Sequence, residues 1–452
     1  MTRPTWIRVG ILLLLGLELQ ALAQQASITT GYFYRRRTDG NLKDPVWPSQ
    51  EMKSNVINTV FDMSSGYLGG WLKADLGWIA AVNFEKDYRC SEVAFCSKTA
   101  DSVDGKTNIW AHTDLDGVAL NRATLGVQND LGDMKWKLRA GYDQLNAGVL
   151  GTNWGFLFPG TYRGAQLDAQ WAGLSFNYAW ADAYRTPWAT EYGYFQDPGG
   201  DRIKEMQTAG LKYQLEGGLY VEGAAGLATG WQKRHFGKLG WKGKVGSSDF
   251  SANYQHYRFR VMGADFIGRK DSFGEQNVVS MQLSTPESWT FTLEYVGTQV
   301  NFWCAVPEFV PRMSAGYGNS QGRLDYWWNA VSDFNKDGER ALNLGIKPPA
   351  VKWNLLSIHT GVNVIQAGHI SGFNANHERT DREGYERGYN LDLSFSFADG
   401  PLKSLSTAVH YTHLKSGGTD LDPNDPGSLY ARYGLYSTDD LKVMLVYSTS
   451  IL

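Results

Sequence analysis

The sequence predicts an all-β fold, namely a transmembrane antiparallel β-barrel with short periplasmic turns and long extracellular loops. This prediction depends on two-faced segments, an N-terminal export signal and low mean hydropathy. In residues 134–143, apolar or small side chains alternate with Lys135, Lys137 and Arg139. Alternate residues of an extended strand project from opposite faces. A sheet built from such strands can close in an outer membrane with its apolar face toward lipid.

The first 23 residues are typical of a secretory signal that is removed from the mature protein. A basic region precedes the apolar residues 9–17, and small residues end at Ala23. The apolar run is shorter than the roughly 20 residues that a membrane-spanning helix needs. We therefore expect cleavage after Ala23. Residues 24–452 then form a single barrel domain, because no Pro- or Ser-rich linker divides them.

The composition excludes two broad classes of protein. A formal net charge of −3 in 452 residues offers no basic surface for nucleic acid. Beyond the signal the chain has no apolar run of about 20 residues, which excludes a helical membrane protein. A mean hydropathy of −0.36 suits a barrel, because half of each strand faces water. The 51 Gly, 24 Tyr and 17 Trp suit tight turns and aromatic girdles at the membrane interfaces.

Strand-like segments alternate with two kinds of connection. The two-faced pattern recurs in residues 166–171, 289–295, 389–397 and 404–411. Tight turns are predicted at residues 64–70, 129–133, 285–288 and 399–403, and long loops at residues 36–53, 85–119, 185–204, 301–339 and 368–384. The segments number about 18, with about 16 or 20 as alternatives. A soluble β-sandwich is the other reading, but segments of about ten residues with aromatic ends favour membrane spans.

The stretch WGFLFPGTYRG at residues 154–164 resembles the end of the third loop and the next strand in the OprD-like porin family. The family motif is matched by Phe158, Pro159, Thr161, Tyr162 and Gly164. Residues 399–406 (DGPLKSLS) are similar to the family's turn and penultimate strand, and residues 159–171, 184–196 and 322–339 are most similar to its chitoporin branch. The resemblance implies a barrel of about 18 strands, an inward-folded third loop and chito-oligosaccharides as substrates.

The predicted constriction is the loop at residues 144–158. Its Asn146, Thr152, Asn153 and Trp154 offer hydrogen-bonding groups beside an aromatic face, and Tyr162 follows them. Sugars have an apolar ring face and a hydroxyl edge, so these residue types are a suitable complement. A selective pore needs such weak binding groups at its narrowest point. The alternative is that Trp154 packs the loop against the wall.

Lumen charges are predicted from the same alternation. If Trp136 faces lipid, then Lys135, Lys137 and Arg139 face the lumen and could guide carboxylates, as in the wider family. The alternative is a solvated face that Asp168 and Asp392 balance from the opposite wall.

The parity of Arg163 matches that of Leu167 and Trp171, which places its side chain on the lipid side unless the strand has a bulge there.

A second group lies in the expected seventh loop. Arg323, Asp325 and Trp327 form either a sugar-docking vestibule or the core of that loop, and the neighbouring Trp328 favours packing.

No metal, cofactor or catalytic site is expected. Cys90 and Cys96 bracket a short loop and predict a disulfide in an oxidising compartment, whereas Cys304 has no evident partner. Residues 333–338 imitate half of a calcium loop, but Leu344 occupies its twelfth position, so an Asp/Asn turn explains them more simply. The histidines are scattered, and no nucleophile elbow or phosphate-binding loop is present.

The sequence therefore predicts a substrate-selective porin in the outer membrane of a Gram-negative bacterium. The expected solutes are small oligosaccharides. The alternatives are a basic-ladder porin for amino acids or aromatic carboxylates, and a non-conducting barrel that serves as an adhesin or a membrane enzyme. Outer-membrane lipids, lipopolysaccharide and the barrel assembly machinery are expected partners of a monomer or weak trimer. The chain ends in Leu452 where such barrels usually end in Phe or Trp, which weakens the assembly signal.

Overall fold

A computed structural model describes residues 24–41, 50–84, 117–152, 154–155, 158–187, 192–197, 199–265, 267–303, 307–314, 321–326, 328–330, 332–374, 376–418 and 436–451. In these segments 18 long strands form one closed antiparallel barrel. They are β1 (Gln25–Asn41), β2 (Gln50–Ser64), β3 (Leu72–Asn83), β4 (Gly117–Leu131), β5 (Met134–Asp143), β9 (Thr161–Trp171), β10 (Leu174–Arg185), β12 (Met206–Gln214), β13 (Leu219–Ala228), β14 (Gln232–Val245), β15 (Ser248–Val261), β16 (Phe273–Ser284), β17 (Thr290–Val300), β19 (Arg340–Lys347), β21 (Leu356–Phe373), β22 (Arg379–Phe397), β23 (Leu405–Gly418) and β24 (Tyr436–Ser450).

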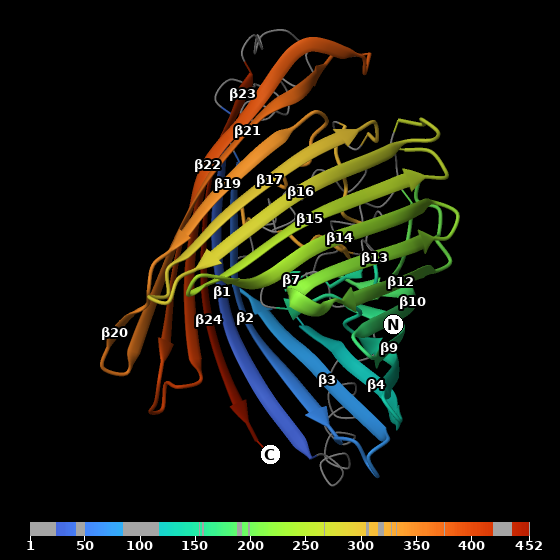
Figure 1. The fold of residues 1–452 in the computed structure, drawn as a ribbon, viewed down its shortest axis with the longest axis vertical. Helices are drawn as coiled ribbons and strands as arrows, with labels where there is room; N and C mark the ends of the chain where they lie inside the picture. Colours follow the sequence, from blue (N-terminus) through green and yellow to red (C-terminus); the bar gives the residue numbers. More distant parts are fainter. Residues whose placement is uncertain are drawn as a thin grey trace.

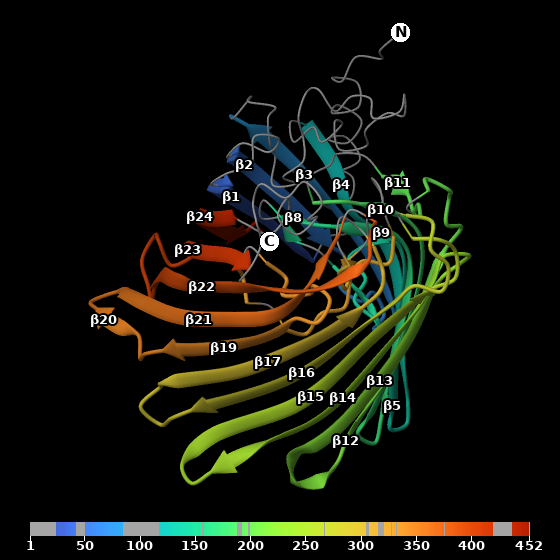
Figure 2. The ribbon, with the colours of Figure 1, turned by 90° about the horizontal axis from the view of Figure 1, so that it is seen from above.

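Each strand pairs with its neighbours in the chain, and the barrel closes where β1 pairs with β24 (Figure 1). At this seam the Arg35 guanidinium of the first strand binds both carboxylate oxygens of Asp440 in the last, at 2.7 and 2.8 Å. Viewed from above, the strands follow one another around the wall (Figure 2). The predicted antiparallel barrel of about 18 strands is confirmed.

The alternation in the sequence produces two faces because successive side chains of a strand point in opposite directions. On β17, Phe291, Leu293 and Tyr295 are each about 40% exposed on the outer face, while Val296 on the inner face is fully buried. Similar apolar side chains are exposed on β12, β14, β19 and β22, including Leu211, Leu239, Leu344 and Leu391. The outer wall is therefore a continuous apolar surface of the kind that lipid covers.

The connections follow the predicted asymmetry, with two corrections. The four tight turns lie where they were predicted. Residues 368–384, predicted as a long loop, are mostly strand, because β21 continues to Phe373 and β22 begins at Arg379. The described part of residues 36–53 is also strand, because β1 continues to Asn41 and β2 begins at Gln50. Polar composition gave the wrong boundary here, because strand pairing needs backbone hydrogen bonds and not apolar side chains, so a wall can continue into water.

Short elements complete the structure. They are β6 (Leu150–Gly151), β7 (Trp154–Gly155), β8 (Phe158–Pro159), β11 (Gly193–Tyr194), β18 (Gln321–Gly322), β20 (Val351–Trp353) and the 3₁₀ turn η2 (Glu216–Gly218). Among the described residues, no helix is long and apolar enough to cross a membrane. The expected signal at residues 1–23, the cysteines Cys90, Cys96 and Cys304, and Leu452 lie outside the described residues.

Candidate functional site

The loop between β5 and β9, residues 144–160, lies against the inner wall; we call it L3. Its Gly148 N–H donates to Asn177 Oδ1 on β10 at 2.7 Å, and its Val149 N–H donates to Thr208 Oγ1 on β12 at 2.8 Å. Its Asn146 N–H donates to Gln166 Oε1 on β9 at 3.1 Å. Three adjacent wall strands therefore hold the backbone of L3 inside the barrel.

Two glycines permit this close approach of loop and wall. Gly148 has a φ of +54°, and a Cβ there would lie 2.1 Å from Thr208 Oγ1. On β13, a Cβ at Gly226 would lie 2.3 Å from Val149 Cγ2. A side chain at either position would push the loop away from the wall.

The long loop between β17 and β19, residues 301–339, joins L3 inside the lumen; we call it L7. Its strand β18 pairs with β6 of L3, and the Arg323 N–H donates to the Val149 carbonyl at 2.7 Å. A Cβ at Gly322 would lie 1.7 Å from the Pro311 carbonyl oxygen, so the second loop is also folded tightly on itself. L3 and L7 therefore contact each other inside the barrel.

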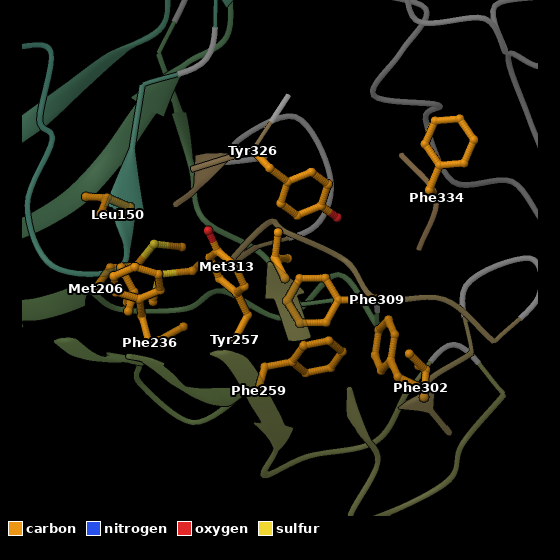
Figure 3. Close-up of a cluster of buried hydrophobic side chains, with 14 of the residues drawn as sticks. Leu150, Met206, Phe236, Tyr257, Phe259, Phe302, Phe309, Met313, Tyr326 and Phe334 are labelled. Atoms are coloured by element: carbon orange, nitrogen blue, oxygen red, sulfur yellow. The ribbon is translucent and has the colours of Figure 1, made fainter. Parts of the chain in front are cut away.

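A core of apolar side chains fills the space between L7 and the wall (Figure 3). From the wall come Phe236 on β14 and Tyr257 and Phe259 on β15, while Phe302 and Phe309 come from L7. The Phe259 ring lies 5.3 Å from each of these L7 rings. The alternation in the sequence did not predict this core. The pattern assumes that the inward face of a barrel strand contacts water, so it gives no sign that aromatic residues on the inward face of β14 and β15 are buried.

Arg234 on β14 fixes the first half of L7. Its guanidinium donates to the carbonyls of Val310, Pro311 and Arg312 at 2.5, 2.8 and 3.0 Å, and it is only 2% exposed. A buried cation normally requires close hydrogen-bonding partners. Here those partners are loop carbonyls, so Arg234 ties the backbone of L7 to the barrel.

A charged group links the second half of L7 to the middle of β13 and β14. Arg323 donates to both oxygens of Asp325 at 2.6 and 2.7 Å and to Glu222 on β13 at 2.5 Å. Lys238 on β14 donates to Asp325 at 2.8 Å. Against the effect of burial, Arg323 and Lys238 hold the pKa of Asp325 below its ordinary value. These contacts place Arg323 and Asp325 on the inner wall and not in an outer vestibule.

Further along, L7 reaches the opposite wall. Trp328 is buried and its Nε1–H donates to Glu294 on β17 at 2.6 Å. The Asn329 carbonyl lies 2.7 Å from His410 Nε2 on β23, and the Lys442 ammonium of β24 donates to Asn329 Oδ1 at 3.0 Å. L7 therefore runs across the inside of the barrel from β13 to β24.

The predicted lumen charges of β5 lie beside acidic partners. Lys137 is 3.9 Å from Asp168, and Arg139 is 2.6 Å from Asp143, the last residue of β5 before L3. Lys135 lies next to the periplasmic turn and is exposed. Asp392 lies on β22, which β4, β3, β2, β1, β24 and β23 separate from β5, and its carboxylate lies 2.7 Å from His410.

Arg163 faces the outer surface. The strand pairing shifts between Ala181 and Ala183 of β10, so a bulge is present, but it lies in the partner strand. The Arg163 guanidinium binds both oxygens of Asp182 at 2.7 and 2.6 Å.

The residues predicted to contact sugar differ in burial and in their hydrogen-bonding partners. Tyr162 is fully buried and its hydroxyl donates to the Gly151 carbonyl at 2.7 Å, so it supports L3 from behind instead of facing a solute. Asn146 is exposed, and its Oδ1 accepts from the Thr152 N–H at 2.8 Å. The backbone of Trp154 pairs with Pro159. Asn153 and Trp327 lie outside the described residues.

Residues 333–338 form a structural turn in L7. The Asp337 carboxylate accepts from the Val300 N–H at 2.9 Å and binds Arg379, while Asn335 donates to the Phe309 carbonyl. Within the described part of the chain, no group of three or more His, Cys, Asp or Glu could hold a metal ion.

Next to this turn, Glu339 is fully buried beside Glu386, whose carboxylate binds Lys336. Burial and the charge of Glu386 raise the pKa of Glu339 above its ordinary value of 4.5. A raised carboxyl pKa means that the folded state holds a proton that the unfolded state has lost. Stability therefore falls as the pH rises from about 4.5 toward the raised pKa.

We expect Glu339→Gln to remove this loss, because an amide needs no proton. The free energy of unfolding is measured in detergent between pH 5 and 8. The difference between the variant and the unmodified protein should increase in favour of the variant as the pH rises. Glu287→Gln, in an exposed periplasmic turn, is the matched control and should show a constant difference. A constant difference for Glu339→Gln as well would contradict the prediction.

Comparisons with known proteins agree with this architecture. A family model described as outer membrane porin, OprD family, matches residues 101–435. The chain belongs to the OprD family. The resemblance seen in the sequence is confirmed, and OprD-family membership places the protein in the outer membrane of a Gram-negative bacterium, where a porin passes small solutes.

Individual OprD-like relatives cover almost the whole chain. Chitoporin of Escherichia coli (strain K12) is 27% identical over 423 residues, which are 87% of this chain and 86% of that protein. Pseudomonas aeruginosa OpdO has a TM-score of 0.67 at 17% identity and covers 95% of this chain and 97% of its own. Acinetobacter baumannii OccAB1 has a TM-score of 0.70 at 14% identity and covers 95% and 98%. These two solved structures share the fold.

Proposed function

We propose that this OprD-family porin admits small neutral oligosaccharides, chito-oligosaccharides in the first place, through the passage narrowed by L3 and L7. The observation that carries the proposal is that the cations near the narrowing have carboxylates beside them. Arg139 lies beside Asp143, and Arg323 lies between Asp325 and Glu222. Paired charges produce a weaker field than bare ones, so such a passage attracts carboxylates less strongly than an unpaired ladder.

The similarity to E. coli chitoporin supports the same substrate class. It extends over 87% of this chain. The proposed sugar contacts are the exposed Asn146, the half-buried Thr152, and Asn153 and Trp154, which follow Thr152 in L3. An aromatic face beside amide and hydroxyl groups complements a sugar ring, and each contact is weak enough to allow release.

Single-channel recording in a planar bilayer tests the proposal directly. We expect steady conductance that chitohexaose interrupts at millimolar or lower concentration. Trp154→Ala should shorten the interruptions, whereas Trp289→Ala, on the outer wall near the periplasmic rim, is the matched control and should leave them unchanged. Absence of interruption at millimolar sugar would overturn the substrate, and absence of conductance would instead favour a non-conducting barrel.

A carboxylate porin is the second candidate. It is favoured by Lys135, which is exposed and has no ionic partner in the part of the chain that the structure describes. If it is correct, replacing Lys135 and Lys137 by Gln abolishes carboxylate uptake and spares sugar uptake. We expect instead that the double variant leaves the chitohexaose interruptions unchanged and carboxylate flux low, as in the unmodified protein.

A further inference from the structure

The outer wall carries a basic group at the extracellular ends of two adjacent strands. On β14 and β15 the side chains below this point are apolar or aromatic, including Leu239 and Tyr254, which are 51% and 47% exposed. Above them the outward positions change to Lys233 and His235 on β14 and to Arg258 and Arg260 on β15. All four side chains are exposed. They lie where the lipid-covered surface ends and the loops begin.

The strand register places these side chains in two facing pairs. Lys233 is directly opposite Arg260, and His235 is directly opposite Arg258. Side chains opposite each other across antiparallel strands lie about 5 Å apart at their Cβ atoms, and like charges there are destabilising. At the other end of the same strands, on the lumen face of the sheet, Lys244 is opposite Asp249 and binds it at 3.0 Å. That pair joins a cation to an anion across the strands, whereas the two extracellular pairs on the outer face do not.

Neighbouring carboxylates satisfy only part of this positive charge. Arg258 lies 3.1 Å from Glu275, and Arg260 lies 2.9 Å from Asp271, which is 75% exposed. Among the described residues, Lys233 and His235 have no ion pair or hydrogen bond through their side chains. Exposed ion pairs such as Arg260 with Asp271 are weak and exchange readily with other partners. The group therefore keeps an excess of donors and of positive charge facing outward.

We propose that Lys233, His235, Arg258 and Arg260 form a binding site for the phosphate groups of lipopolysaccharide in the outer leaflet. Guanidinium and ammonium groups bind phosphate through short charge-assisted hydrogen bonds, and planar arginines do so with two bonds each. The apolar belt directly below supplies the surface for acyl chains of the same lipid. A bound phosphate removes the repulsion between Lys233 and Arg260, which face each other across the strands. The porin thus holds an outer-leaflet lipid at a defined place on its wall.

The test uses the full-length porin in detergent, with EDTA present so that no divalent cation bridges the charges. Binding of phosphorylated lipid A is titrated by native mass spectrometry and compared with dephosphorylated lipid A and with inorganic phosphate. We expect Lys233→Gln with Arg260→Gln to weaken binding of phosphorylated lipid A about 10- to 30-fold. The matched control replaces Lys244 and Lys352, two exposed lysines at the periplasmic rim, by Gln and should bind normally.

The outcomes separate this site from the transport proposal. Equal binding of phosphorylated and dephosphorylated lipid A by the unmodified porin would overturn the site without any variant. Equal binding by the double variant, or displacement of the lipid by inorganic phosphate at equal concentration, would also overturn it. Single-channel conductance of the double variant should equal that of the unmodified porin, because the group faces away from the lumen.

Discussion

Replacing Asp440 by Asn is expected to lower the free energy of unfolding by about 3–5 kcal/mol, because it removes the carboxylate of a buried, bidentate ion pair with Arg35. Asp440 is 1% exposed and binds Arg35 with both oxygens, while Lys442 lies 3.6 Å away. This pair joins the first and last strands. Its loss therefore weakens the contact between β1 and β24, the two neighbouring wall strands that are farthest apart in the chain.

Unfolding by urea of barrels inserted in lipid vesicles gives the measurement. Asp439→Asn is the matched control, because the same carboxylate chemistry is lost one residue away on the exposed outer face, where Asp439 binds Tyr411 and His413. Exposed pairs contribute about 1 kcal/mol or less. If the two variants lose equal stability, the buried pair of Arg35 and Asp440 contributes no more to stability than an exposed pair, and the prediction is wrong.

Arg234→Met should raise the single-channel conductance severalfold and weaken the chitohexaose interruptions. The variant removes three hydrogen bonds from a buried cation to the carbonyls of L7, each of about 1.5–3 kcal/mol. Met roughly retains the volume beside Phe259 and Phe309 but cannot hold the loop. We therefore expect L7 to leave the wall and the lumen to widen.

The control for this variant lies one residue away on the same strand. Lys233→Met changes a cation on the outer face of β14 and should leave the conductance unchanged. Unchanged conductance in Arg234→Met would mean that the apolar core alone keeps L7 in place. That core would then be tested by Phe309→Ala, which removes an aromatic ring from L7.

The wall of the barrel could be predicted from the sequence because its rule is local. Residues 134–143 and 389–397 alternate strictly, and both lie in strands, β5 and β22, with the expected faces. The boundaries failed where a strand continues beyond lipid, as at residues 368–384. There the outward side chains meet water, so hydropathy no longer distinguishes strand from loop.

The inward fold of the loops could be predicted only in outline. The family resemblance implies that the third loop folds inward, and L3 does so. The roles of single residues depend on contacts between distant segments, which no local pattern contains. Tyr162 is buried and donates its hydroxyl to the Gly151 carbonyl of L3, and Arg323 binds Glu222 only because L7 enters the barrel.

The pairing of β6 with β18 has a consequence for the order in which the porin matures. Residues 150–151 meet residues 321–322 across a very long stretch of chain, and closing such a loop costs more entropy than forming any hairpin of the wall. We therefore expect the contact between L3 and L7 to form later in folding than the hairpins of neighbouring wall strands, so that these strands can pair before the loops inside the barrel are in place.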